Sequence, residues 1–256
     1  MKSKTKFLNG FIFLILLFIG LSAAADDKGK PSLAQFMQRV RTPPSQKTWA
    51  QLDGVITNMK RDKDGKRIIT KSEIYLGIRF SSEMIFAQVI IGDNEIYSVG
   101  QPYSMIKSGV TVMREGDKES NRLRGNFGIK PEDLTMSFLF WNVIKELPED
   151  SLKLIPCRVF LLISPDKSEI ARVHISRDNY FPVKVEWSKS DESKQFTEAT
   201  RTLEVLSFKK VNGLYLVNVL SFYGPGWRTK IEFSNTQAGY VKDGTPKGLF
   251  KDNKSN

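Results

Sequence analysis

The chain has 256 residues and a formal net charge of +11, and it contains one cysteine and one histidine. A single thiol cannot form an internal disulfide, so the fold must depend on its hydrophobic core. One histidine and one cysteine far apart in the sequence also make no zinc site, and we expect neither a metal nor a cofactor.

Residues 1–25 have the composition of a cleaved secretory signal. Three lysines lie in the first six residues, an apolar run covers 11–21, and Ala23 and Ala25 form the small-residue pair that a signal peptidase recognises. The alternative, an uncleaved membrane anchor, is weaker because the apolar run is shorter than the roughly 20 residues that span a bilayer. We therefore expect cleavage near Ala25 and export to the periplasm.

Cleavage removes three lysines and no carboxylate, which leaves a formal charge of +8. This charge favours anionic lipid head groups or acidic partners and predicts transient membrane contact. Export argues against nucleic acid, and no dense motif of basic and aromatic residues favours it. Basic clusters occur at Lys60-Arg61 with Lys63, at Lys66-Arg67 and at Lys209-Lys210. Most such clusters only solvate a surface, so none is assigned as a site.

The mature domain, residues 26–240, is expected to begin with a short amphipathic helix. Ser32 and Gln35 form a capping box directly after Pro31. Apolar residues at 33, 36, 37 and 40 then follow helical spacing, and the helix is expected to end near Arg41, before two prolines.

From Trp49 the apolar period changes to two, which is typical of strands. Strands are expected from residue 49 to the turn at 62–65, then over 68–80, 84–91, 95–99 and 108–114. Residues 116–130 are charged and contain glycine, so they are expected to form a loop. Pro131 then begins a second short helix, whose apolar stripe is Leu134, Phe138 and Trp141.

Six further strands are expected, over 158–164, 169–176, 182–187, 200–208, 214–223 and 228–234. Their spacing indicates an antiparallel meander rather than βαβ units. The tail, 241–256, is polar and is expected to be frayed. The fold class is therefore mainly β: one large antiparallel sheet with two short helices. Such scant helical cover leaves room for an apolar cavity between sheet and helices.

The residues that could carry catalysis do not form a recognisable site. Strand alternation places His174 beside Arg172 on a solvent-facing or partly covered face, and Cys157 enters an apolar strand as a small buried side chain. Glu132 and Asp133 lie at a helix start, where carboxylates favour the helix dipole. Nucleotide-binding and hydrolase motifs are missing from the sequence. We therefore interpret the chain as a binding protein without catalytic residues.

Five segments resemble the LolA-like outer membrane lipoprotein-sorting proteins. Asp133–Trp141 resembles D-L-T-x-x-F-x-x-W, and 156–159 stands where the family has G-x-x-C-x-V, although the glycine is missing. Residues 172–186 resemble V-x-x-W-I-D-x-x-x-x-x-P-L-K-x-E, 210–215 resembles K-V-D-G-L-W, and 228–233 resembles R-T-x-L-x-F. The resemblance extends from about Ser32 to Ser234 and is carried by the order and spacing of these segments.

This resemblance implies an unclosed, strongly curved antiparallel β half-barrel with short helices across its concave face. It also implies a periplasmic carrier that shields the acyl chains of a lipoprotein, or another lipid. In this family an inner-membrane transporter is the donor and an outer-membrane protein is the acceptor. Burial of acyl chains contributes about 0.8 kcal/mol per methylene, so one long chain is worth on the order of 10 kcal/mol.

The candidate cavity residues are the apolar side chains of the two helices and of the first two strands. Each of them could equally be ordinary core, and only the scant helical cover favours a cavity. They are Phe36, Met37, Val40, Leu52, Ile74, Leu76, Ile78, Leu134, Phe138 and Trp141.

Two other functions remain open. An envelope sensor or binding module of the same fold would hold a protein or lipid signal without transporting it. An enzyme of outer-membrane lipid metabolism would need a pocket where polar residues converge.

Overall fold

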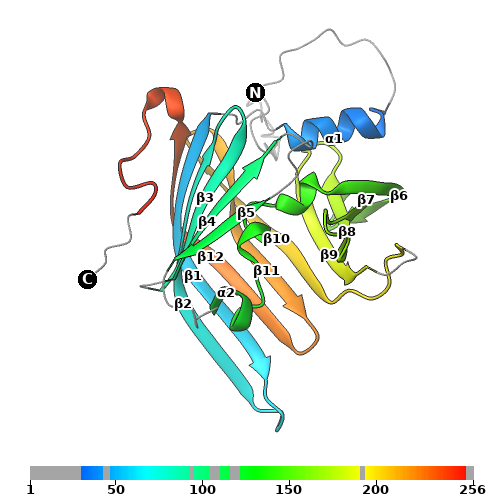
Figure 1. Ribbon diagram of the computed structural model, residues 1–256, viewed down its shortest axis with the longest axis horizontal. Coiled ribbons are helices and arrows are strands. Elements are labelled where there is room, and N and C mark those ends of the chain that lie inside the picture. The colour runs from blue at the N-terminus through cyan, green and yellow to red at the C-terminus, as the bar shows by residue number, and fades with distance from the viewer. Residues whose placement is uncertain are drawn as a thin grey trace, which may run out of the picture.

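A single curved antiparallel sheet dominates the protein (Figure 1). The computed structural model describes residues 30–42, 47–92, 95–103, 110–115, 122–190 and 194–251, and the expected signal sequence lies outside them. In this part of the chain, 12 strands follow the order β5-β4-β3-β2-β1-β12-β11-β10-β9-β8-β7-β6, and the sheet does not close. The expected mainly β half-barrel is confirmed. None of the helices described here has the length and apolar character needed to cross a membrane.

Of the strands described, 11 lie close to the expected positions, and β6 was not expected. Their bounds are Thr48–Arg61 (β1), Arg67–Phe80 (β2), Met84–Ile91 (β3), Glu95–Pro102 (β4), Thr111–Glu115 (β5), Asn142–Leu152 (β6), Ile155–Ile163 (β7), Glu169–Ser176 (β8), Pro182–Lys189 (β9), Arg201–Val211 (β10), Leu214–Gly224 (β11) and Trp227–Tyr240 (β12).

Two meanders meet at the centre of the sheet, where the first strand pairs with the last. Ala50 of β1 lies opposite Ala238 of β12 on one side and Ile78 of β2 on the other. A β-bulge follows Asp53, and Gly54 is required there because a Cβ at this position would lie 2.3 Å from the Glu232 carbonyl oxygen. This pairing joins two halves of the chain that are far apart in sequence.

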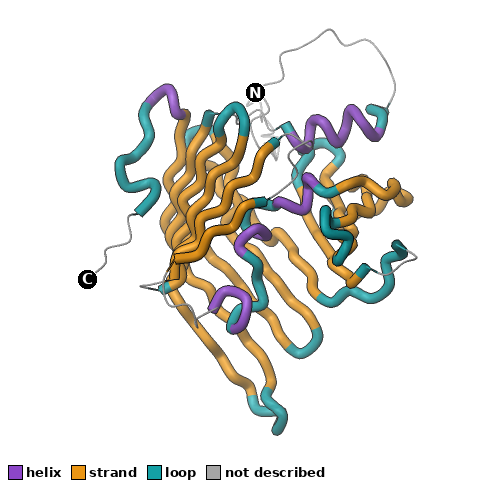
Figure 2. Tube along the Cα trace, viewed as in Figure 1, coloured by secondary structure: helices purple, strands orange, loops and turns teal. Residues whose placement is uncertain are grey.

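The first expected helix is confirmed as α1 (Leu33–Arg41). Ser32 and Gln35 form its capping box, and Phe36, Met37 and Val40 are buried. Apart from the turn that follows β12, the short helical segments lie along the inner side of the curved sheet (Figure 2). One turn of helix in the expected loop, α2 (Arg122–Gly125), buries Leu123 and was not predicted.

The prediction of a second helix with one continuous apolar stripe was wrong. Residues 131–141 form two 3₁₀ turns, η2 (Pro131–Asp133) and η3 (Ser137–Phe140), separated by Met136 in the left-handed region with φ of 55°. A left-handed residue ends a helix, so the stripe of Leu134, Phe138 and Trp141 is not helical. Its first two members are still buried.

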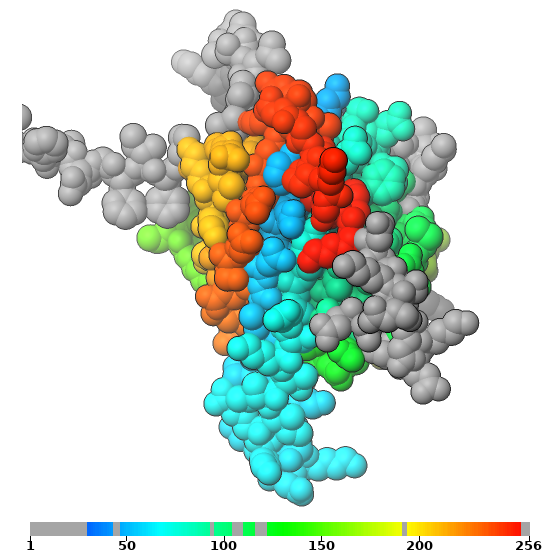
Figure 3. All heavy atoms as spheres, turned by 90° about the vertical axis from the view of Figure 1, so that its left-hand side faces the viewer, coloured from blue at the N-terminus to red at the C-terminus, as the bar shows by residue number. Residues whose placement is uncertain are grey.

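Packing of the C-terminal segment corrects the expectation of a frayed tail. Leu249 is buried, and the Tyr75 hydroxyl donates to its carbonyl oxygen at 2.6 Å. The Gln88 side chain and the Lys251 backbone exchange two hydrogen bonds, of 2.8 and 2.7 Å. Another 3₁₀ turn, η4 (Val241–Asp243), starts this segment. It lies over the blue and cyan strands in Figure 3.

His174 is buried, although strand alternation suggested a solvent-facing or partly covered position. Its register partners are Val159 of β7 and Lys184 of β9, and the Asp150 carboxylate lies 3.3 Å from its Nε2 atom. Asp150 of β6 and the charged side chains of Lys184 and Glu186 on β9 lie around the imidazole. Burial lowers the pKa of His174 below its ordinary value of about 6.5.

Stability should therefore fall as the solution becomes acidic. Below about pH 6.5 the unfolded chain takes up a proton on His174 that the folded chain resists, so acidification favours unfolding. Urea titrations between pH 8 and pH 5 should show a smaller decrease in the free energy of unfolding for His174→Gln than for the unmodified protein. Parallel pH profiles would contradict this assignment.

Candidate functional site

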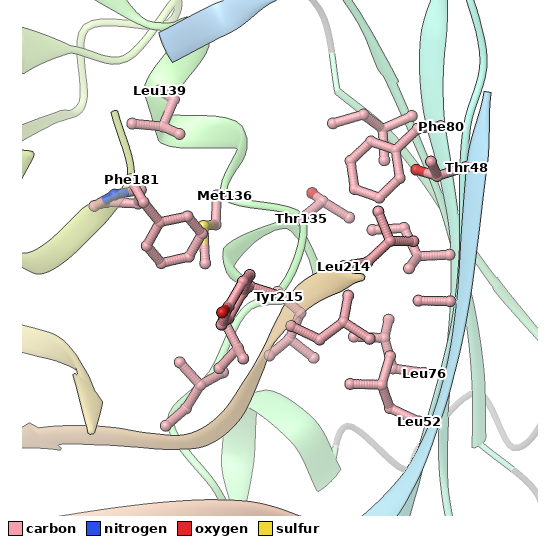
Figure 4. A pocket seen from close by; sticks show the side chains of 18 of the residues that line it. Thr48, Leu52, Leu76, Phe80, Thr135, Met136, Leu139, Phe181, Leu214 and Tyr215 are labelled. Carbon is pink, nitrogen blue, oxygen red and sulfur yellow. The ribbon is translucent and has the colours of Figure 1, made fainter. Parts of the chain in front are cut away.

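An apolar cavity of about 210 Å³ lies between the sheet and its short helical cover. One wall is formed by the start of β1 and the end of β2, and the opposite wall by the β8–β9 turn and the start of β11. Residues of α1 and of the segment 134–140 cover it. In Figure 4, Phe181 and Met136 lie across from Leu52, Leu76 and Phe80.

None of the side chains lining this cavity carries a charge. Its polar side-chain groups come from Thr48, Trp49, Thr135, Asn179, Tyr180 and Tyr215, and the other lining residues are aliphatic or aromatic apart from Met136 and Pro182. A surface of this kind binds hydrocarbon by area rather than by placed hydrogen bonds. Methionine adapts to irregular apolar shapes, so Met136 suits a ligand of variable outline.

The structure brings five of the ten candidate residues together at the cavity: Val40, Leu52, Leu76, Ile78 and Leu134. Four others, Phe36, Met37, Ile74 and Phe138, are buried in the core around it. Trp141 is half-buried and lines a second cavity instead. Met136 interrupts the expected helix, so the side chains of Leu134 and Trp141 do not share one helical face and line different cavities.

Sequence reasoning missed the wall formed by the β8–β9 turn and by β11. Phe181 follows a turn, and the segment Leu214–Val217 is apolar on both faces. A continuous apolar run could have indicated this wall, because strands covered on both faces lose the alternation of half-exposed ones.

Two buried arginines hold α1 in place, one against the sheet and one against the segment 137–141. Arg158 on β7 makes two 2.7 Å contacts to Glu146 and donates to the Pro31 carbonyl oxygen at 2.8 Å, directly before α1. Its guanidinium also lies 4.4 Å from the centre of the Phe36 ring. At the other end of α1, Arg41 donates to the carbonyl oxygens of Leu139 and Trp141 at 2.8 and 2.6 Å.

A second cavity, of about 270 Å³, has several charged residues in its lining, and four of them form ion pairs. Arg201 on β10 pairs with Asp133, and Lys130 lies 2.6 Å from Glu169 on β8. The Asp133 carboxylate also accepts from the Lys130 backbone at 2.9 Å. These pairs fix the segment 130–133 on β8 and β10.

Cys157 is buried, as expected, and burial raises the pKa of its thiol, which keeps it protonated and unreactive at neutral pH. Across the described ranges, no three histidine, cysteine, aspartate or glutamate side chains gather in a way that could hold a metal ion.

No family model matches the sequence, and no curated protein shows significant similarity to it. Solved structures do match. A DUF1329 family protein from Desulfovibrio piger has a TM-score of 0.60 at 13% identity, over 84% of this chain and 94% of that one. A structure described as an outer membrane lipoprotein-sorting protein domain, from Vibrio parahaemolyticus, has a TM-score of 0.56 at 13% identity, over 85% of this chain and 94% of that one. At this identity the likeness shows a shared fold.

Proposed function

We propose that the protein is a periplasmic carrier that shields the acyl chains of a lipoprotein, or of another lipid, for sorting to the outer membrane. The uncharged cavity under α1 and η3 is the observation that carries this proposal. An acyl chain placed there loses contact with water along its length. Its burial stabilises the complex by about 0.8 kcal/mol per methylene. An inner-membrane donor and an outer-membrane acceptor complete the proposed route.

The shared fold of the Vibrio parahaemolyticus domain supports this proposal, since that domain is described as lipoprotein-sorting.

Organic extraction of the protein purified from its native envelope tests the proposal. Mass spectrometry should recover lipid in a fixed ratio to protein after gentle purification. Repeatedly empty protein that also fails to take up lipid from vesicles would overturn the carrier role. Capture of a stoichiometric protein partner with an empty cavity would favour a sensor instead.

Membrane contact is proposed at the tip of the β1–β2 hairpin, which projects from the body of the protein (Figure 3). Six cations lie on residues 60–71, and none of them pairs with a carboxylate among the residues described. Asp62 instead accepts from the Asp64 and Lys66 backbones within its own turn. Ile68 and Ile69 are exposed beside these charges, by 37% and 57%. Unpaired cations beside exposed aliphatic side chains fit an anionic bilayer surface.

Replacing Lys63, Lys66 and Lys71 by serine should weaken binding to vesicles that contain phosphatidylglycerol. Each basic residue near such a surface contributes about 1 kcal/mol, so the triple variant should lose on the order of a hundredfold in partition coefficient, measured by vesicle sedimentation. The matched control replaces three exposed lysines elsewhere, Lys189, Lys194 and Lys247, at the same change in net charge. Equal losses in both variants would show that only total charge matters.

A further inference from the structure

Two cations lie beside tyrosines that line the apolar cavity. Arg39 of α1 donates from Nη1 to the Tyr180 hydroxyl at 2.6 Å. The Lys210 ammonium on β10 lies 5.1 Å from the centre of the Tyr215 ring. Tyr180 and Tyr215 are half-buried and line the cavity, whereas Arg39 and Lys210 are exposed. The two cations therefore stand where the cavity meets solvent.

A pair of phenylalanines connects these two places. Phe181 lines the cavity and packs edge to face on Phe208, with ring centres 5.0 Å apart. Phe208 and Lys210 are two residues apart on β10, so their side chains leave the same face of the sheet. Lys209 leaves the opposite face and donates to the Ser234 carbonyl oxygen at 3.2 Å. An aromatic rim thus runs from Tyr180 to Tyr215, with a cation at each end.

Carboxylates that could neutralise this rim are scarce among the described residues. The nine residues of α1 and the segment 208–215 contain neither aspartate nor glutamate. The β8–β9 turn contributes Asp178, which lies 3.4 Å from Arg177. Neither Arg39 nor Lys210 forms an ion pair with any described carboxylate. An anion at the rim would therefore meet two available positive charges.

From this geometry we infer that the ligand is an anionic amphiphile: its hydrocarbon occupies the cavity and its phosphate or carboxylate lies at this rim, in the positive field of Arg39 and Lys210. This inference rests on the proposed lipid carrier function and adds the chemical class of the head group. Arginine binds such oxyanions through its planar fork of donors, and lysine binds them as a point charge. An uncharged lipid with the same chain would give neither cation an anionic partner.

Calorimetry with three probes tests the inference: 1-palmitoyl lysophosphatidic acid, monopalmitoylglycerol and glycerol 3-phosphate. The two lipids share one chain and differ by the phosphate. The phosphorylated lipid should bind at least about tenfold more tightly, the value of one charge-assisted hydrogen bond. Glycerol 3-phosphate should not bind measurably, because exposed cations without hydrocarbon burial are weak sites.

The double variant Arg39→Gln/Lys210→Gln should remove the preference for the phosphorylated lipid while still binding monopalmitoylglycerol. Lys209→Gln, which removes a neighbouring charge from the other face, should keep the preference. Equal affinity of the unmodified protein for both lipids would overturn the head-group inference and leave the carrier proposal intact. Failure to bind either lipid would overturn the carrier proposal itself. Binding of glycerol 3-phosphate as tight as that of the lipid would show a simple phosphate site and overturn the inference.

Discussion

Replacing Arg158 by alanine should lower the free energy of unfolding by about 3 kcal/mol. Only 2% of this side chain is exposed. Its guanidinium forms an ion pair with Glu146, donates to the Pro31 carbonyl oxygen and lies over the face of the Phe36 ring. Its removal leaves a carboxylate and a carbonyl oxygen without their donor and opens a hole beside α1. Equilibrium urea unfolding, followed by tryptophan fluorescence, measures the loss.

The matched control is Arg177→Ala, because Arg177 is 48% exposed and pairs with the exposed Asp178. That surface pair should contribute less than about 0.5 kcal/mol. The Arg158 effect should also depend on pH. The hydrogen bond from Arg158 lowers the pKa of Glu146, so its contribution is present above about pH 4.5 and is lost as the pH falls through the lowered value. A loss for Arg158→Ala no larger than for the control would contradict this account.

Filling the cavity should abolish most lipid binding without unfolding the protein. Val217 on β11 lines the cavity and is only half-buried, so a tryptophan at this position can extend into the empty volume. Excluding even two methylenes of an acyl chain removes about 1.6 kcal/mol, so the affinity for a fluorescent fatty acid should fall by about tenfold or more. Titration of the purified variant with that probe gives the dissociation constant.

Val112→Trp is the corresponding control, because Val112 is 40% exposed on the edge strand β5 and does not line the cavity. It makes the same chemical change away from the proposed site. Unchanged lipid affinity in Val217→Trp, with native unfolding behaviour, would show that the cavity is not where hydrocarbon binds.

Most strands were predictable from sequence because one face of each is buried, which leaves a period of two. The strand β6 was not predicted, since it carries Pro148 and several charges and contains two register irregularities. These are features of an edge strand, where no second neighbour requires a regular ladder. His174 is also buried, beside Asp150 of β6 and Lys184 of β9. The alternation of side chains along β8 alone cannot show such cover from other strands.

The candidate site was predictable only in part, for a geometric reason. Apolar spacing identifies residues that face inward, such as Phe36 and Leu52, but it does not separate close packing from an unfilled space. Phe36 packs on Phe160 with ring centres 5.6 Å apart, whereas Leu52 borders the cavity. That difference depends on the left-handed turn at Met136, which sets how closely the cover approaches the sheet.

Pairing of β1 with β12 has a consequence for how the chain reaches its native state. These two strands make the central contact of the sheet, yet they are separated by the whole length of the domain. When the chain emerges from its N-terminus, β1 can pair with β2 early, but its other edge has to wait for residues near 240. Contacts of such long sequence separation form slowly. The two meanders therefore cannot join into one sheet until the last strand has been delivered.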